Sequence, residues 1–521
     1  MEAAAPPSLP GPRPWWETRW FVAAMILAAV IPLAYPPVPP LVDLLGHMGR
    51  YTVQLDLASS PELQRFYAYD WHLIGNLGVD ILVIPLSKLF GLEMAVKLIA
   101  MSIPPLTVGG FLWVAREVHN RLPPTAAFAL PFAIGHPFLF GFVNFTLSMA
   151  LAFLAFGLWL RLGRLGRTTL RLVLFVPISF VLFFCHTFGW GTLGLLAFSA
   201  EAVRQHDKGV DWWKAALSAA LHAVVMAGPV VVMLTWRSTV QSGGTADWFN
   251  LPAKASWIMM SLRDRWQWFD FACVAALLAV IVEARRRPEL TFSRNLAFSA
   301  LVLLAGFMIL PRIVFGSAYA DMRLAPFMIA TAILAIRFRT ETVMPLARKL
   351  AVLAVGFYAL RIVATTISLA MASNDQEAKL DALDHVPRGV ALVSLVGQEC
   401  KALWALPRNT HLPAMALVRR HAFSNDQWTV EGANLLSVRY KAAGHFTADP
   451  SQIVRPAECE SKEAWAAERA LAAIPKGVFD YVWLVDVPPI DPRLVDGMTP
   501  VWRGPGSLLY AIGKTGDQPK P

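Results

Sequence analysis

The sequence predicts an all-α polytopic membrane domain followed by a small α/β domain. Of the 521 residues, 56% are hydrophobic, the mean hydropathy is +0.49, and 19 residues are Trp. Soluble domains of this length do not have such a composition, so most of the chain is expected to lie in a bilayer. The apolar character stops near residue 371. We therefore expect a transmembrane domain over residues 1–371 and a C-terminal α/β domain over residues 372–521.

Apolar stretches long enough to span a bilayer predict about eleven transmembrane helices. They lie near residues 20–35, 93–114, 125–140, 142–160, 170–184, 189–202, 215–236, 269–282, 296–310, 324–336 and 351–371. Arg13 and Arg19 precede the first stretch, and no small-residue cleavage site follows it. This pattern is typical of an uncleaved anchor with its N-terminus in the cytoplasm.

The Lys and Arg distribution predicts the orientation, because cytoplasmic loops carry the excess of these residues. If segment 77–90 crossed the membrane, the four arginines between residues 161 and 171 would face outward. If segment 77–90 lies along the outer surface, they face inward together with the other basic loops. These other loops are near residues 116–121, 285–294 and 337–349.

The second arrangement is favoured, and it places three loops and the C-terminal domain outside. The outer loops are residues 36–91, 237–268 and 311–323. The net charge of +10 then reflects basic residues that lie against anionic lipid, and it requires no nucleic-acid partner. We expect a multi-pass protein of a bacterial inner membrane with a periplasmic C-terminal domain.

The C-terminal domain contains both strand-like and helix-like patterns. Segments 390–396, 482–487 and 507–512 are predicted strands, and segment 461–473 has helical spacing. Its only cysteines are Cys400 and Cys459, for which we predict a disulfide in an oxidising compartment. Cys185 and Cys273 are lone thiols in predicted spans, where packing roles are expected.

The first outer loop, residues 36–91, carries the densest set of acids, histidines and arginines. Two sets have helical spacing and would each lie on one helix face. They are Asp43, His47 and Arg50, and then His72, Asn76 and Asp80. The loop also contains Asp70.

This loop resembles the first outer loop of the GT-C superfamily of polyprenyl-phosphate-dependent glycosyltransferases. The resemblance rests on an acid just after the first span and on an Asn-Leu-Gly-Val-Asp stretch followed by Leu-Phe-Gly before the second span. The order of Asp43, His47 and Arg50 looks closest to a bacterial branch in which a His and an Arg follow the loop acid. The resemblance implies juxtamembrane helices in this loop, a polyprenyl-phosphate-linked sugar donor and, in many members, a periplasmic C-terminal domain.

By analogy with the family, Asp43 is the general base that activates an acceptor, and His47 and Arg50 orient it or contact phosphate. The alternative is that Asp43 caps a surface helix and that Arg50 extends to lipid headgroups. Asp70 and Asp80 are either a second acid or metal ligand, or ordinary solvated residues. The sequence lacks the Asp-Glu or Glu-x-Asp pairs of many GT-C enzymes. Metal use therefore stays open, with a divalent ion as the candidate cofactor.

Cations at the outer face are candidates for binding the donor phosphate, because arginine presents a planar fork of donors. Ionisable groups in spans are costly unless they have a role. The candidates are Lys97, Arg312, Arg323 and His186. The alternatives are an Arg323–Asp321 pair, anchoring in headgroups, and, for His136, Asn144 and His186, hydrogen bonds between helices.

Two other classes of function compete with a glycosyltransferase. A transporter or flippase of a lipid-linked or anionic solute would place its polar residues near the bilayer midplane in paired repeats, whereas these polar residues gather at one face. A non-catalytic membrane scaffold would not depend on Asp43. The sequence contains no nucleotide-phosphate loop, which argues against an ATP-driven pump.

Overall fold

The computed structural model describes residues 13–237, 244–314, 317–339, 342–401, 403–429 and 434–513. The chain forms two compact units. Unit 1 comprises Met1–Tyr35, Leu73–Val79 and Leu98–Ile367, and unit 2 comprises Pro36–His72, Asp80–Lys97 and Ser368–Pro521. The first outer loop predicted from the sequence is therefore divided, and most of it groups with the C-terminal segment.

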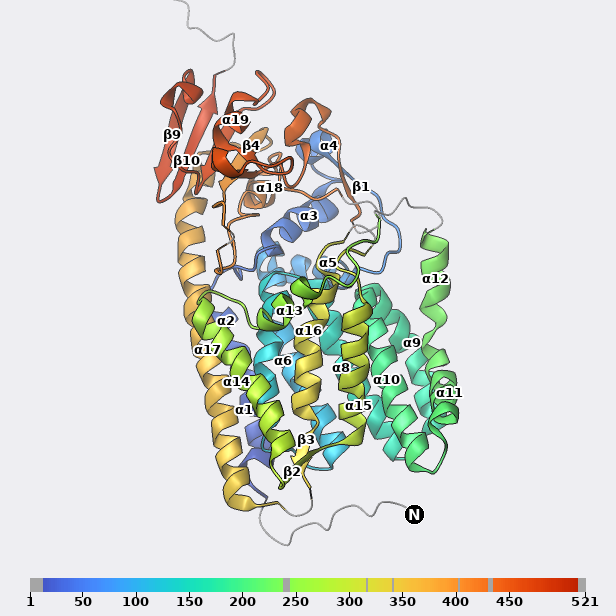
Figure 1. The fold of residues 1–521 in the computed structure, drawn as a ribbon. Coiled ribbons are helices and arrows are strands. Elements are labelled where there is room, and N and C mark those ends of the chain that lie inside the picture. Colours follow the sequence, from blue (N-terminus) through green and yellow to red (C-terminus); the bar gives the residue numbers. More distant parts are fainter. Residues whose placement is uncertain are drawn as a thin grey trace, which may run out of the picture. The chain divides into compact units, whose positions relative to one another are not determined.

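Unit 1 is helical (Figure 1). Its α-helices are α1 Arg19–Ala28, α2 Ile31–Ala34, α7 His136–Leu139, α8 Val143–Arg164, α9 Thr168–Cys185, α10 Thr187–Asp207, α11 Trp212–Ala223, α12 Gly228–Arg237, α13 Leu251–Met259, α14 Gln267–Arg286, α15 Arg294–Ile309 and α16 Ala320–Leu334. Short 3-10 helices are η1 Trp15–Glu17, η2 Ala126–Ile134 and η3 Val224–Met226. Helices α6 Leu92–His119 and α17 Met344–Leu380 each contribute most of their length to this unit, and β2 Leu290–Phe292 pairs with β3 Ile336–Phe338.

Five helices of the described residues are long and apolar enough to cross a membrane, and a sixth counts if one bent pair forms a single span. The pair is α11–η3 and α12, which meet at an angle of 61°. Gly228 and Pro229 stand at this bend, where a proline removes a helical hydrogen bond. Every apolar stretch predicted from the sequence contains helix, but several of these helices are shorter than a bilayer requires.

The predicted span 125–140 is the clearest departure from the sequence analysis. This stretch is the nine-residue 3-10 helix η2 followed by the four-residue helix α7. Pro131 lies inside η2 and Pro137 lies in the first turn of α7, so neither can donate a backbone hydrogen bond. Because every residue of both elements is buried, the apolar composition here reflects packing inside unit 1.

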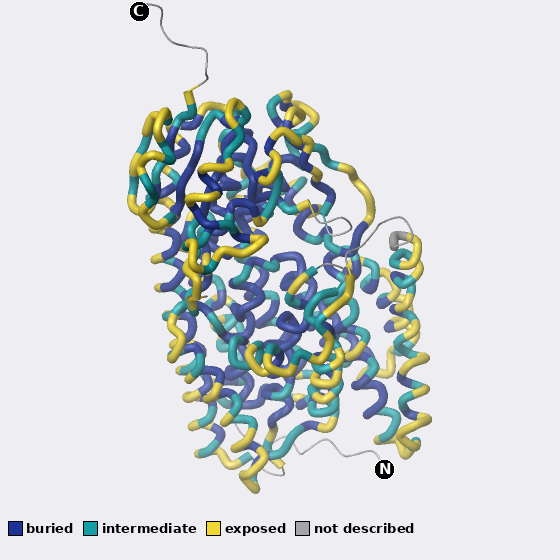
Figure 2. The backbone as a smooth tube through the Cα atoms, turned by 45° about the horizontal axis from the view of Figure 1, so that its top comes forward, coloured by how far each residue is buried: buried dark blue, intermediate teal, exposed yellow. Residues whose placement is uncertain are grey.

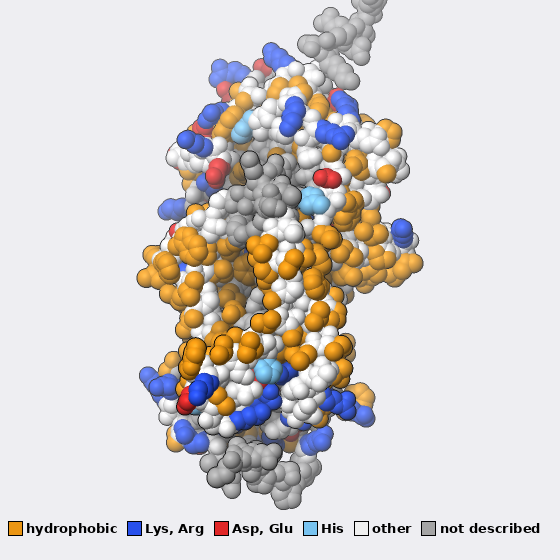
Figure 3. All heavy atoms as spheres, turned by 90° about the vertical axis from the view of Figure 1, so that its right-hand side faces the viewer, with side chains coloured by type: hydrophobic (Ala, Val, Ile, Leu, Met, Phe, Trp, Pro, Cys, Tyr) orange, Lys and Arg blue, Asp and Glu red, His pale blue; other side chains and the backbone are white. Residues whose placement is uncertain are grey.

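The interior of unit 1 is built around α8 and α16, and the outer helices expose apolar side chains. Nearly all residues of α16 are buried, and the rings of Phe153 and Phe327 stack with centroids 5.9 Å apart. The exposed apolar side chains include Val173, Val181, Leu221 and Val231 on α9, α11 and α12. Figure 3 shows hydrophobic side chains forming a belt on this face of unit 1, with Lys and Arg at the lower end of the unit. Such a belt is suited to lipid.

Unit 2 contains a six-stranded sheet in the order β7-β6-β4-β8-β10-β9. The strands are β4 Leu392–Gly397, β6 Ile453–Arg455, β7 Trp465–Ala466, β8 Tyr481–Val485, β9 Met498–Gly504 and β10 Ser507–Ile512. The ladder from β7 to β8 is parallel, and β10 pairs antiparallel with β8 and β9. The three strands predicted from the sequence are confirmed. The predicted helix 461–473 is wrong at its start, because Trp465–Ala466 is a strand and only α19 Ala467–Ala472 is helical.

The other elements of unit 2 pack the outer loop against the C-terminal segment. They include α3 Leu44–Asp56, α4 Pro61–Phe66, most of α5 Gly78–Phe90, α18 Ala414–Arg420, β1 Tyr67–Tyr69 and β5 Leu436–Val438. Strands β1 and β5 pair antiparallel. Side chains of α3, α4 and β1 also share a buried apolar core with β4 and β8. Figure 2 shows the buried backbone of this unit enclosed by exposed turns.

The structure joins Cys400 and Cys459, whose Cα atoms are 5.5 Å apart. Cys185 and Cys273 are buried thiols of unit 1 that take no part in a disulfide. This arrangement is the one predicted for each of the four cysteines.

Candidate functional site

The first candidate site begins with Asp43, the residue before α3 in unit 2. Asp43 occupies the N-cap position, but its side chain makes no capping hydrogen bond. The helix lies close to the C-terminal segment because Gly46 and Gly49 face it. A Cβ at Gly46 would lie 2.7 Å from the Trp428 ring, and one at Gly49 would lie 2.6 Å from the Gln427 amide. Asp43 is therefore part of a packed interface within unit 2.

Asp43 belongs to an acidic cluster around His411, made of Asp43, Asp426, Asp449 and His411. His411 Nδ1 lies 3.6 Å from the Asp426 carboxylate, and Nε2 lies 3.9 Å from that of Asp449. Burial opposes protonation of His411, but the hydrogen bond with Asp426 and the charges of Asp449, Asp426 and Asp43 raise its pKa to about 9. His411 is therefore an imidazolium at neutral pH. Burial raises the pKa of Asp449, against the opposing effects of His411 and Gln452.

His47 is connected to the acidic cluster through Trp428. The His47 ring lies 5.0 Å from the Trp428 ring, which lies 4.3 Å from the His411 ring. The spacing of Asp43 and His47 in the sequence thus places both beside this cluster.

Arg50 and Asp80 form a buried ion pair. Their side chains are 3% and 2% exposed, and Arg50 Nη2 lies 2.9 Å from Asp80 Oδ1. Arg50 also donates to the Asn434 side chain, and Gln54 donates to the Asp80 carbonyl oxygen at 2.7 Å. The pair joins α3 to α5 inside unit 2 and neutralises both charges. Arg50 therefore does not extend to headgroups.

Two further candidates of unit 2 lie in different surroundings. The Asp70 side chain is 94% exposed, and its carboxylate lies 3.9 Å from His72 Nδ1. Lys97 is half-buried in α6. The part of the chain that the structure describes has no group of three or more His, Cys, Asp or Glu side chains arranged to hold a metal ion. No role is derived for a metal.

The second candidate site surrounds Arg323, near the start of α16 in unit 1. Arg323 is buried, and its guanidinium carbon lies 4.2 Å from the Phe142 ring centroid. The rings of Phe145 and Phe188 are each 5.8 Å away. Such aromatic faces attract the cation. The guanidinium also contacts Ser317 Oγ and the Ala318 carbonyl oxygen, both at 3.4 Å.

His186 completes this second site and presents a donor to it. The residue caps α10, and its Nδ1 accepts a hydrogen bond from the Phe188 amide at 3.2 Å. A neutral imidazole with Nδ1 as acceptor carries its proton on Nε2. That nitrogen lies 3.4 Å from Arg323 Nη1. Two donor groups therefore face each other, an arrangement that suits an anion between or beside them. We refer to Arg323 and His186 as the donor pair.

The other cation predicted here has a carboxylate partner. Arg312 lies 3.4 Å from Asp247 and is partly exposed. Asp321 contacts Lys254 at 3.3 Å, and both side chains are buried. Lys254 also donates to the carbonyl oxygens of Phe307 and Leu310 at 2.7 Å.

Asn144 and His136, two buried polar residues of unit 1, differ in their hydrogen bonds. The Asn144 side chain accepts from the Val79 amide at 2.6 Å and donates to the Asn76 carbonyl oxygen at 3.0 Å. It thereby fastens segment Leu73–Val79 to α8. His136 is 1% exposed, and within the described residues neither ring nitrogen has a hydrogen-bond partner. Asn144 therefore makes hydrogen bonds that join two segments, of the type predicted, whereas His136 makes none within the described residues.

Sequence reasoning missed His411, Trp428 and Lys254. The available signal was the run Ser424–Asn425–Asp426–Gln427 before Trp428, since four consecutive polar residues are unusual in a buried segment. All four are at most 1% exposed.

Comparison with solved structures identifies the fold of the chain. No protein-family model matches the chain, and no curated protein matches it. Two solved structures of ArnT from Cupriavidus metallidurans do match, one bound to undecaprenyl phosphate and one in the apo state. Each is 12% identical with a TM-score of 0.50 and covers 96% of this chain, and the match covers 99% and 98% of the respective ArnT chains. The chain therefore has the polytopic membrane fold of ArnT, in agreement with the fold class that the sequence predicted.

Proposed function

We propose that this protein is a membrane glycosyltransferase that moves a sugar from a polyprenyl-phosphate donor to a periplasmic or lipid acceptor. The observation that carries the proposal is the donor pair of Arg323 and His186, buried among aromatic rings in a fold shared along its length with ArnT. The related ArnT structure holds undecaprenyl phosphate, a lipid with the same kind of anionic group. We further propose a bacterial inner-membrane location, with unit 2 on the periplasmic side.

In the proposed reaction the acceptor attacks the anomeric carbon of the sugar. The bond from that carbon to the phosphate oxygen breaks, a bond to the acceptor oxygen or nitrogen forms, and the acceptor proton passes to a carboxylate. We assign the carboxylate to Asp43 and the charge on the departing lipid phosphate to the donor pair. Preorganised donors at a developing anion are usually the largest electrostatic contribution to such a step.

The remaining candidates receive supporting roles. Trp428 and His47 position the side chains around Asp43. Arg50 and Asp80 hold α3 against α5. Lys97 and Arg312 are secondary candidates for phosphate, and Asp70 is the next candidate for the base.

The test is sugar transfer by the purified full-length chain in nanodiscs, supplied with polyprenyl-phosphate sugars of several kinds. Asp43→Asn should lower turnover by about 10²–10⁴-fold with little change in donor affinity. Arg323→Gln should weaken donor binding instead. Asp70→Asn tests the next candidate for the base, an exposed acid of the same loop, and should retain activity if Asp43 is the base.

Two results would contradict these assignments. Full activity of Asp43→Asn together with loss in Asp70→Asn would move the base to Asp70. If the wild type transfers no sugar from any donor but binds the lipid, a transporter or flippase becomes the better hypothesis.

A further inference from the structure

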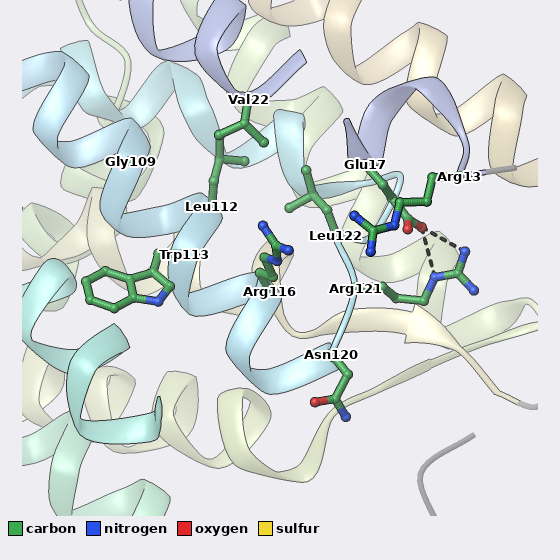
Figure 4. A pocket seen from close by; sticks show the side chains of 10 residues that line it. All are labelled: Arg13, Glu17, Val22, Gly109, Leu112, Trp113, Arg116, Asn120, Arg121 and Leu122. Carbon is green, nitrogen blue, oxygen red and sulfur yellow. Dashed lines mark hydrogen bonds and ion pairs between the residues drawn. The ribbon is translucent and has the colours of Figure 1, made fainter. Parts of the chain in front are cut away.

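A further polar site, separate from the donor pair, lies in unit 1 in a cavity of about 250 Å³ between the start of α1 and the end of α6. Its ten lining residues divide into a polar part and an apolar part (Figure 4). The polar residues are Arg13, Glu17, Arg116, Asn120 and Arg121. The apolar wall comes from α1, α6 and Leu122. We call this space the arginine pocket.

The charges of the arginine pocket favour an anion. Glu17 is the only acid among the described lining residues; it accepts a hydrogen bond from Arg121 Nε at 2.8 Å and lies 2.8 Å from Arg121 Nη2. Arg13 and Arg116 are exposed, and no ion pair or hydrogen bond of their side chains exists within the described residues. Figure 4 shows both guanidinium groups directed into the pocket. The lining therefore has a formal charge of +2, with two arginines available for a ligand.

The apolar wall indicates that this anion carries a hydrocarbon chain. Val22 of α1 and Leu112 of α6 line the pocket, and the opposite face of α1 exposes Trp20 and Leu27 at 73% and 67%. A helix with such exposed apolar side chains faces lipid. A ligand with an anionic head and an apolar tail matches both parts of the pocket.

The tryptophans place the pocket at headgroup level. Trp15 and Trp20 are exposed beside it, and Arg19 lies 5.1 Å from the Trp20 ring centroid. Tryptophan and arginine with this exposure are typical of a membrane–water interface. The positive residues of this end are the ones that the sequence assigns to the cytoplasmic side.

We propose that the arginine pocket binds the phosphate headgroup of an anionic phospholipid. A free phosphate shares the headgroup chemistry, but it would make no use of the apolar wall. The proposed glycosyltransferase activity is not needed for this site, and the test below contains no sugar donor.

The experiment is native mass spectrometry of the full-length chain in detergent, titrated with phosphatidylglycerol or with phosphatidylcholine of the same acyl chains. The wild type should retain phosphatidylglycerol in preference to phosphatidylcholine. The double variant Arg13→Gln/Arg116→Gln should lose about tenfold or more in phosphatidylglycerol affinity, since each basic residue near the surface contributes appreciably to anionic-lipid binding. Arg116→Lys keeps the charge and should retain most of the binding.

The matched control is Arg285→Gln/Arg286→Gln, which removes two exposed arginines from the end of α14. It should bind phosphatidylglycerol like the wild type. Equal loss in the control, or no loss in Arg13→Gln/Arg116→Gln, would overturn the proposal. Displacement of phosphatidylglycerol by inorganic phosphate at equal concentration would overturn the assignment to a lipid.

Discussion

The two ring nitrogens of His186 have different roles: one caps helix α10, and the other faces Arg323. Nδ1 accepts a hydrogen bond from the Phe188 amide at the start of α10, and Nε2 lies 3.4 Å from Arg323 Nη1. His186→Asn should preserve the cap, because Asn is a favoured N-cap residue, while it removes the donor beside Arg323. His186→Ala removes both.

We therefore predict that His186→Asn weakens binding of a polyprenyl phosphate by about tenfold and leaves thermal stability close to that of the wild type. His186→Ala should also lower stability, by about 1 kcal/mol. Lipid titration and thermal unfolding of the purified variants measure the two effects. Wild-type lipid affinity in His186→Asn would show that the donor pair does not bind phosphate.

The raised pKa of His411 leads to a second prediction, which concerns the pH dependence of stability. Its folded-state pKa of about 9 lies above the unfolded value of about 6.5, so its stabilising effect is fully present below pH 6.5 and is lost as pH rises through 9. The effect is on the order of 3 kcal/mol. Burial also raises the pKa of Asp449, which lies beside His411.

Thermal unfolding of the wild type and of His411→Gln should be compared from pH 6 to pH 10. The wild type should lose stability between pH 6.5 and 10 more steeply than the variant. Parallel curves for the two proteins would mean that His411 does not hold a proton in the folded state.

These residues also show what the sequence could reveal. The helical spacing of Asp43 and His47 predicts a shared face, and both do lie beside the acidic cluster. Their partners His411 and Trp428 are more than 360 residues away in the chain, and the polar run before Trp428 does not indicate which part of the outer loop it contacts. Such contacts depend on the fold, so no pattern in the outer loop could predict them.

At the scale of elements, the Arg50–Asp80 ion pair and the hydrogen bond from Gln54 to the Asp80 carbonyl oxygen join α3 to α5. Removing one partner leaves the other charge buried, which typically costs about 3–5 kcal/mol. Replacing both by apolar residues removes this penalty. We predict that Asp80→Leu strongly destabilises the protein and that Arg50→Met/Asp80→Leu recovers much of the loss.

Thermal unfolding and sugar transfer of the two variants separate a structural role from a catalytic one. A stable, active double variant assigns the pair to folding. A stable double variant without transfer would instead return Arg50 or Asp80 to the reaction. Additive losses of stability would contradict the predicted coupling.

The elements also differ in how well their sequences predict them. The strand 507–512 was predicted with its observed bounds, because a continuous apolar run between turns is a strong strand signal. The stretch 125–140 has a similar apolar signal, but its prolines prevent a continuous α-helix. An apolar composition indicates that a segment is buried. Whether the segment is a continuous helix depends on individual residues such as proline.

At the scale of the whole molecule, the basic loops of unit 1 gather at one end. The ladder of β2 and β3 joins the segment after α14 to the segment after α16. Arg294 pairs with Asp207 at the end of α10, and Arg164 at the end of α8 pairs with Glu117 of α6. The helix ends that the charge distribution assigns to the cytoplasm are thus in contact with each other.

This arrangement supports a prediction of topology: the N-terminus and the basic loops lie inside, and the chain after α17 lies outside. Alkaline phosphatase is active only when exported, so fusions placed after Met371 should be active and fusions at Arg286 should be inactive. Fusions at Gly166 and at Arg339 are further inside positions, since both follow helices that end at the basic end of unit 1. The reverse pattern would place Asp43 in the cytoplasm, where an undecaprenyl-phosphate sugar that faces the periplasm could not reach it. That result would overturn the proposed reaction, whereas binding of a phospholipid in the arginine pocket would be unaffected and would only change leaflet.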